Sequence, residues 1–412
     1  MDTEKTVCTP SDAVNSMAAD WPMLRALMGG TRAMREAGRL YLPPFPQEGD
    51  KAYQARLDTA VLHPVYSRTC KVMAAKPFSE PVGMDGFSAQ TLQWLRDCDR
   101  SGTNWQAFAM QTALNAIAYG LDCVQVEFSG NGQARTRAEE KRAGARPYLV
   151  RWPAWTVLGW KTNPQTGALA QIRLLESLAQ PDGEFHEKNT EQVRVLEPGS
   201  WSVYRKNADG VWVLDESGGT SLDVIPVVLF YGAREAMGIG RPLMPDLAYQ
   251  NVEHWQSRSD QQTILHVARV PILFAKGFGA GDEIIIGASQ ATQSTSADAD
   301  LRYVEHSGAA IAAGKQDIDD LEERMRKTGA EVLTIPLAQK TATQASIEAD
   351  ASKSLLQAFA ENLEDSLSEV MTLWCRYVGE QPGTVEIRKQ FAEADAQQPQ
   401  TPNTPPTGAA AT

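Results

Sequence analysis

The feature that most constrains the fold is a series of short strand-like segments between residues 121 and 231 with no useful helix between them. Turn residues such as Pro198-Gly199 and Asp209-Gly210 separate them. Short strands joined by turns predict an antiparallel meander. A doubly wound nucleotide-binding fold needs helices between its strands, so that fold is excluded. The expected strands are Cys123–Phe128, Tyr148–Trp152, Trp155–Lys161, Ala168–Glu176, Gln192–Glu197, Trp201–Lys206, Val211–Leu214 and Val224–Tyr231.

Helical periodicity flanks this region on both sides, which predicts an α+β protein. Trp105 to Tyr119 has an apolar side and stops at Gly120. A helix with an apolar face is expected from Ile318 to Val332. Another, from Thr343 to Tyr377, would span roughly 50 Å. An N-terminal helix capped by Asp12 and interrupted by Pro22 is also predicted.

The segment Ala236–Gly277 joins the two regions. A glycine-rich turn precedes Pro242, which we expect at the first position of a helix. The helix begins with helically spaced apolar residues, becomes polar on every face over Gln256–Gln262, and leads into a strand over Val270–Phe274. A helix polar all round is not expected to pack into its own subunit. It predicts a subunit interface or a wet channel, with a solvated surface helix as the alternative.

The bulk composition fits a globular chain with two or three domains: 412 residues, 42% hydrophobic and 22% charged. A formal charge of -12 argues against a protein that grips nucleic acid through its phosphates. The five cysteines have no metal-ligand or disulfide spacing. No basic-then-apolar signal pattern opens the chain, and no apolar run approaches ~18 residues, so we expect no membrane segment.

No stretch predicts catalytic, cofactor-binding or metal-binding residues. Gly308 to Gln316 superficially resembles a phosphate loop, but five residues separate its glycines and Gln316 stands where Ser or Thr should bind magnesium. Gly277 to Asp282 is read as a mobile loop. His254 and His266 lie about three turns apart on one helix, so they cannot share a metal and are expected at an interface or the surface.

Paired carboxylates such as Asp319-Asp320 are expected on a solvated helix face. The tryptophans of the strand region are read as core residues rather than base-stacking ones, because basic residues are not interleaved with them.

Collinear motifs between residues 40 and 380 resemble the portal proteins of tailed bacteriophages, specifically a portal-like family catalogued as a domain of unknown function. The motifs that carry the resemblance are Leu42-Pro43, Tyr53-Gln54-Ala55-Arg56, Arg68 to Phe78, Ala118-Tyr119-Gly120-Leu121, Arg146-Pro147-Tyr148, Gly238-Ile239-Gly240-Arg241-Pro242-Leu243, Asp246-Leu247, Val270-Pro271, Tyr303 to Gly308, Leu321-Glu322 to Gly329-Ala330 and Lys340-Thr341-Ala342-Thr343.

This resemblance implies a homo-oligomeric ring of about twelve subunits at one capsid vertex. The ring would be the channel for double-stranded DNA during packaging and ejection. Its implied partners are the terminase large subunit, the major capsid and scaffolding proteins, and a head-to-tail adaptor or neck protein. The implied location is the virion, after assembly in the host cytoplasm, with no membrane, cofactor or catalytic role.

The resemblance also divides the chain. Residues 1–239 would form the wing with its meander, 240–266 a stem helix, and 267–300 a small clip. Residues 301–335 would be a tunnel-proximal strand and helix, 336–380 a long wing or crown helix, and 381–412 a disordered tail. A second full-length stem helix is not found between residues 275 and 300. The candidate channel or interface residues are Arg258, Asp260, Gln261, Lys315, Arg324, Arg326 and Lys327, with ordinary surface or ion-paired roles as the alternative.

Two other classes of function stay open at this point. An enzyme acting on nucleotides or nucleic acid should carry a phosphate loop or a clustered acidic metal site, and neither is found. Another phage head-to-tail adaptor or minor capsid protein is the closer alternative, although adaptors are usually much shorter.

Overall fold

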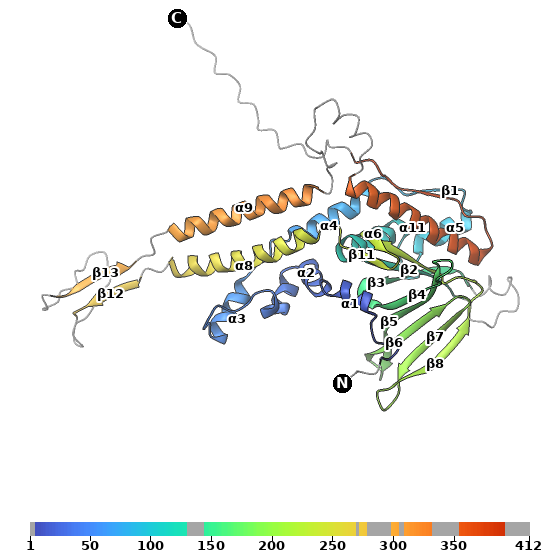
Figure 1. Ribbon diagram of the computed structural model, residues 1–412, viewed down its shortest axis with the longest axis horizontal. Coiled ribbons are helices and arrows are strands. Elements are labelled where there is room, and N and C mark those ends of the chain that lie inside the picture. Colours follow the sequence, from blue (N-terminus) through green and yellow to red (C-terminus); the bar gives the residue numbers. More distant parts are fainter. Residues whose placement is uncertain are drawn as a thin grey trace, which may run out of the picture.

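A computed structural model describes residues 5–129, 144–268, 272–277, 298–304, 309–331 and 354–391. Its shape is a mixed α/β body with one long projection (Figure 1). We call this projection the arm: the helices α8 (Pro245–Ala268) and α9 (Ala309–Glu331) with the strands β12 (Ile272–Lys276) and β13 (Asp300–Val304). The α+β class predicted from the sequence is confirmed.

Helices dominate the N-terminal third. Pro22 does not interrupt a helix there; it lies in the first turn of α2, and Ser11 rather than Asp12 caps α1 by accepting from the N–H of Val14 at 3.4 Å. The α-helices are α1 (Asp12–Ala18), α2 (Trp21–Ala37), α3 (Asp50–Thr59), α4 (Val65–Ala75), α5 (Ala89–Trp94) and α6 (Trp105–Tyr119). Short 3-10 turns are η1 (Gly38–Leu40), η2 (Lys76–Phe78), η3 (Leu95–Asp97) and η4 (Ala154–Thr156).

The predicted antiparallel meander is confirmed as a five-stranded sheet of order β4-β5-β6-β7-β8. A three-stranded antiparallel sheet, β3-β2-β9, lies beside it, and three strand pairs, β1-β14, β10-β11 and β12-β13, complete the set. The strands outside the arm are β1 (Gly83–Asp85), β2 (Leu121–Phe128), β3 (Pro147–Pro153), β4 (Val157–Thr162), β5 (Leu169–Asp182), β6 (His186–Glu197), β7 (Ser200–Lys206), β8 (Trp212–Gly219), β9 (Val227–Tyr231), β10 (Ala233–Ala236), β11 (Ile239–Arg241) and β14 (Thr384–Glu386).

The main core lies where α6 and α11 (Leu355–Val378) pack on the three-stranded sheet. The first six residues of β2 are all buried, which shows that both faces of this strand are covered. The tryptophans also fit the core reading: Trp152 is buried, and Trp155, Trp160 and Trp201 pack partly buried against the same core.

The last long helix is shorter than predicted. α11 begins after Ser354, whose extended backbone and side chain cap its N-terminus by accepting from the N–H of Gln357. A continuous helix from Thr343 is therefore wrong, because a capping residue ends the helical register there. Gly379 ends the helix in the left-handed conformation, as predicted.

The arm differs most from the sequence expectation. Its first helix starts at Pro245 rather than Pro242, because Leu243 is still held by a backbone hydrogen bond to the carbonyl of Ile117 (3.0 Å). The strand predicted near residue 301 pairs with β12. The expected boundary between the clip (267–300) and the tunnel-proximal segment (301–335) therefore divides a single two-stranded ribbon. The second long helix of the arm is α9, which runs back beside α8 (Figure 1).

Several predicted features lie outside the described residues. They are most of the basic insert at 134–146, the apolar run at 283–287, the upstream part of the 336–380 segment and the tail from 397. Among the described helices, none combines the length and apolar character that a membrane crossing requires.

Gly120 offers a test of this architecture. It has φ +88, and a Cβ there would lie 2.6 Å from the backbone of Arg241. Backbone atoms cannot move aside as a side chain can. Gly120→Ala should therefore lower the free energy of unfolding by about 1–2 kcal/mol through left-handed strain and by about 1–3 kcal/mol through overpacking.

Gly102→Ala is the matched control, since Gly102 has the same φ of +88 and nothing within 4 Å of a built Cβ. The free energies of unfolding of the two variants, measured by urea denaturation, should differ by the overpacking cost alone. Equal midpoints would contradict the close approach of the two backbone segments.

Candidate interface: the arm and its ribbon

The polar face of α8 turns inward, which corrects the expectation that this helix avoids its own subunit. Asn251, His254, Ser259 and Gln261 are all buried. The helix packs against α2, α3, α4 and α9, so these polar residues are buried by other elements of the same chain. Buried polar groups are costly unless they are hydrogen-bonded, and each contact below supplies such a partner.

Asn251 joins α8 to the start of α4. Its side-chain Oδ1 accepts from the backbone N–H of Tyr66 (2.9 Å), and its Nδ2 donates to the carbonyl of His63 (2.9 Å). The residue before α4, Pro64, has no side-chain acceptor for this helix terminus. Asn251 therefore caps α4 from a distant helix and satisfies a backbone N–H that the local sequence leaves free.

Arg56 of α3 forms the second contact with α8. Its guanidinium binds Glu48 in a bidentate manner, with Nε–Oε1 at 3.0 Å and Nη2–Oε2 at 2.8 Å, and its Nη2 also donates to the carbonyl of Pro43 (2.8 Å). Only 5% of the Arg56 side chain and 8% of the Glu48 side chain are exposed. The remaining nitrogen approaches Asp260 of α8 at 3.7 Å. This buried ion pair therefore holds the 43–48 loop, α3 and α8 together.

Gln261 joins the two long helices. It is buried and its Nε2 donates to the carbonyl of Ile311 in α9 (2.9 Å). A Cβ on Gly314 would lie 2.3 Å from the Gln261 side-chain oxygen, so the glycine permits this approach. Gly314 and Lys315 lie within helix α9. The resemblance of this stretch to a phosphate loop is therefore superficial, as the residue spacing indicated.

The charged candidates form the outer surface of the arm. Arg324 pairs with Glu253 of α8 at 3.6 Å, and Lys327 pairs with Glu323 at 3.8 Å. Arg326 also pairs with Glu323. Arg258 and Lys315 are exposed and have no ion pair within the described part of the chain. The seven candidates thus divide into inward contacts (Asp260, Gln261), surface ion pairs (Arg324, Arg326, Lys327) and free exposed cations (Arg258, Lys315).

The ribbon β12–β13 stands at the far end of the arm (Figure 1). Phe274 is 40% exposed and Leu301 is 38% exposed, although they lie on strands. Arg302 pairs with Phe274 across the ribbon, with its guanidinium 5.5 Å from the ring centre. An isolated two-stranded ribbon is at best marginally stable in water. Within the described residues both edges of the ribbon are unpaired, and together with its exposed apolar groups they favour contact with another chain.

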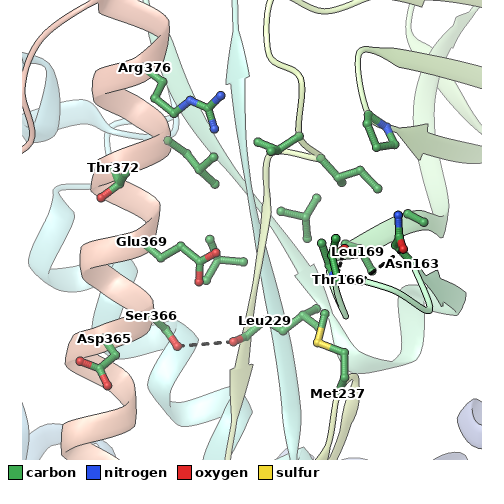
Figure 2. A pocket seen from close by; sticks show the side chains of 18 of the residues that line it. Asn163, Thr166, Leu169, Leu229, Met237, Asp365, Ser366, Glu369, Thr372 and Arg376 are labelled. Carbon is green, nitrogen blue, oxygen red and sulfur yellow. Dashed lines mark hydrogen bonds between the residues drawn. The ribbon is translucent and has the colours of Figure 1, made fainter.

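A cleft of ≈ 610 Å³ on the body is a second candidate site (Figure 2). Glu369 reaches from α11 toward strand β9, and burial raises the pKa of this carboxyl. Ser366 donates to the carbonyl of Leu229 (3.4 Å), and Arg376 pairs with Asp223. The contacts of Ser366 and Arg376 hold α11 to its surroundings. The described lining therefore forms structural contacts rather than a nucleophile with its base.

Sequence reasoning missed the inward contacts because their partners are remote: Arg56 and Ser259 are separated by 203 positions, and Asn251 and Tyr66 by 185. The available signal was the density of amide and hydroxyl side chains on α8, which a solvated helix does not require. It identifies a helix with buried polar contacts but not their partners.

Arg56→Ala should destabilise the protein by about 3–5 kcal/mol, because Glu48 would be left buried without its cation. Arg32→Ala is the control: it breaks an Arg–Glu pair whose arginine is 90% exposed, and its cost should stay within about 0.5 kcal/mol. Urea unfolding midpoints measure both. Similar losses for the two variants would show that the buried pair is not an organising contact.

The same pair predicts a pH dependence. The hydrogen bond from Arg56 holds the pKa of Glu48 below its ordinary value of 4.5, against the opposing effect of burial. The folded pKa is the lower one, so this stabilisation is complete above the unfolded pKa of about 4.3 and is lost as pH falls through the folded pKa. The stability difference between wild type and Glu48→Gln should therefore shrink progressively as the pH falls below about 5; a constant difference would contradict the assignment.

Comparisons with known proteins give a partial match. Residues 242–378, about a third of the chain, match a family described as a domain of unknown function (DUF4055). No curated protein matches the sequence. A chain in the virion of a native gene transfer agent particle is similar at 12% identity and TM-score 0.39, over 88% of this chain and 90% of that one.

Two neck structures of gene transfer agent particles are also similar at 12% identity. One is an empty particle computed with C6 symmetry (TM-score 0.41, 80% of this chain and 81% of that one). The other is a native particle computed with C12 symmetry (TM-score 0.39, 88% and 91%). TM-scores of this size do not establish a shared fold, so the role of the chain depends on its own geometry.

Proposed function

We propose that this chain is a portal subunit of a tailed bacteriophage or phage-like particle, a structural protein that forms a ring around a DNA channel at one capsid vertex. The observation that carries the proposal is the arm: two antiparallel helices of 24 and 23 residues that end in an exposed β-ribbon. At 1.5 Å per residue each helix is about 35 Å long. The collinear motifs that resemble the portal family run through the same segments.

The arm suits a position between identical neighbours. The apolar stripe of α9, which includes Ile318, Leu321 and Met325, is buried within the subunit. The opposite side of α9 carries exposed charges of both signs, among them Asp319 and Lys315. Mixed charges at a surface set register and partner choice more than affinity. In a closed ring each arm would meet the next one through this surface, and the ribbons would cover one another's edges.

The charge of the arm is compatible with DNA that slides. α8 carries three carboxylates and one arginine, and α9 carries six carboxylates and four Lys or Arg residues, which gives nine negative against five positive charges. Few unpaired cations mean few phosphate contacts and little binding energy to break at each step. On this proposal Arg258 and Lys315 are the residues to examine at the channel or the subunit interface.

The remaining roles follow from the portal assignment. The ring would dock the terminase large subunit during packaging and a neck or adaptor protein afterwards, and it would be placed in the shell with capsid and scaffolding proteins. No residue of the chain is assigned a catalytic role, so a separate chain would hydrolyse ATP. The alternative is another head-to-tail adaptor or minor capsid protein, which the exposed ribbon at the end of a long arm also accommodates.

Negative-stain electron microscopy of the purified chain tests the proposal. Rings with a central hole, near twelve-fold in end-on views, are the expected result. Capture of the terminase large subunit by these rings would distinguish a portal from an adaptor. Monomers or dimers, both alone and with purified scaffolding protein, would overturn the ring assignment.

Phe274→Asp should weaken ring formation, because it places a charge where an exposed aromatic group would be covered by a neighbour. A cost of about 1.4 kcal/mol at each contact weakens that contact tenfold, and mass photometry would show smaller species at low concentration. Phe185→Asp is the control: Phe185 is 84% exposed between β5 and β6 on the body. Equal effects of both changes would remove the ribbon from the interface.

A further inference from the structure

Three metal-ligating side chains from distant parts of the sequence meet where the arm joins the body. They are His63 from the α3–α4 connection, His254 from α8 and Glu322 from α9. The Nε2 atom of His254 lies 3.1 Å from Glu322 Oε1, and the Nδ1 atom of His63 lies 3.5 Å from the same oxygen. One ligand atom from each residue lies within 4.8 Å of the other two.

The separations of 3.1 and 3.5 Å between the two imidazole nitrogens and Glu322 Oε1 fit a shared transition-metal ion. Ligand atoms about 2.0–2.2 Å from a common Zn²⁺ lie roughly 3.3 Å apart when their arrangement is tetrahedral. The two imidazole rings meet edge to face, with centres 5.2 Å apart and an interplanar angle of 61°. In this arrangement each ring can direct a nitrogen toward Glu322. Two imidazoles and one carboxylate form a ligand set that Zn²⁺ and neighbouring divalent metals use.

The surroundings give the site both rigidity and access. Only 2% of the His254 side chain is exposed, against 41% for His63 and 36% for Glu322. The backbone carbonyl of His63 is fixed by Asn251 at 2.9 Å. The site therefore has one deeply fixed ligand and two ligands that solvent can reach.

A cleft of ≈ 370 Å³ opens on His63 and Glu322 and offers a path for the ion. His63, Glu322, Thr69 and Met325 line it. Two arginines line it as well, Arg68 and Arg326, and the latter is held by Glu323 on its own helix. The cleft leaves room for water as the fourth ligand of a tetrahedral ion.

We propose that His63, His254 and Glu322 form a divalent transition-metal site of the Zn²⁺ class that fixes α8 and α9 to the α3–α4 connection. This proposal does not depend on the portal assignment, because the site lies within one subunit. A bound ion would replace the hydrogen bond between His254 and Glu322 with bonds from all three side chains to one centre. The angle of the arm on the body would then be set by the ion as well as by packing.

The test is metal binding to the full chain. After treatment with chelator and desalting, Zn²⁺ is titrated in competition with a chromophoric chelator, and bound metal is measured by mass spectrometry of the element. The expected result is one Zn²⁺ per chain and a raised thermal midpoint. Co²⁺ in place of Zn²⁺ should give visible d–d absorption of a four-coordinate site, a readout that does not depend on oligomeric state.

Variants of the two half-exposed ligands identify the site without disturbing the buried histidine. His63→Ala and Glu322→Gln should each weaken Zn²⁺ binding at least about tenfold, since loss of even an outer-shell partner weakens metal sites 10–100-fold. The controls are His266→Ala on the exposed end of α8 and Asp319→Asn on α9, both exposed. These should bind Zn²⁺ as the wild type does.

Two outcomes would overturn the proposal. The first is a chain that retains no Zn²⁺ or Co²⁺ at micromolar free metal. The second is one equivalent of metal whose affinity and Co²⁺ spectrum are unchanged in His63→Ala and Glu322→Gln, which would assign the ion to other residues. Rings that form without metal would not affect the assignment of the metal site. A chain that binds metal but forms no rings would overturn the portal proposal and leave the metal site supported.

Discussion

The arrangement of the arm depends on the need to satisfy the polar groups that α8 buries. An amide or hydroxyl removed from water without a partner costs more free energy than a typical hydrogen bond contributes. Asn251, Ser259 and Gln261 are buried on one helix, so the helix has few rotations or translations that satisfy all of them together. Apolar packing tolerates small shifts, whereas this set of directional contacts specifies one position for α8 against α3, α4 and α9.

The body was largely predictable from sequence because its signals are local. Alternating residues with turns such as Asp209-Gly210 identified the meander, and the left-handed Gly120 marked the end of α6. The start of α8 was predicted wrongly because the same local rule fits two positions in the sequence. A proline fits the first turn of a helix, and both Pro242 and Pro245 were available. The backbone contact of Leu243 with Ile117, which decides between them, is not visible in the sequence.

The candidate interface was predictable only in part. Helical periodicity located the two arm helices, and charge patterning placed Asp319-Asp320 on the exposed face of α9, where the structure has them. The inward role of Asp260 and Gln261 was missed, since period and polarity do not distinguish a polar residue that faces water from one that faces a buried arginine. The meeting of His63 with His254 was also beyond sequence reasoning, because 191 positions separate them and their contact exists only after α4 and α8 have packed.

Main-chain contacts hold the segment that precedes α8 against the end of α6, in addition to the side-chain contacts that α8 makes with α3 and α4. Gly120 accepts a hydrogen bond from the N–H of Gly232 (3.0 Å), and a Cβ on Gly240 would lie 2.2 Å from the Gly120 carbonyl oxygen. These contacts are made by main-chain atoms, which have no side-chain rotamers. A shift of the segment before α8 therefore cannot be accommodated by side-chain rearrangement at Gly120. We therefore expect any shift at the start of the arm to be shared with the end of α6 and the three-stranded sheet, because their main chains are in direct contact.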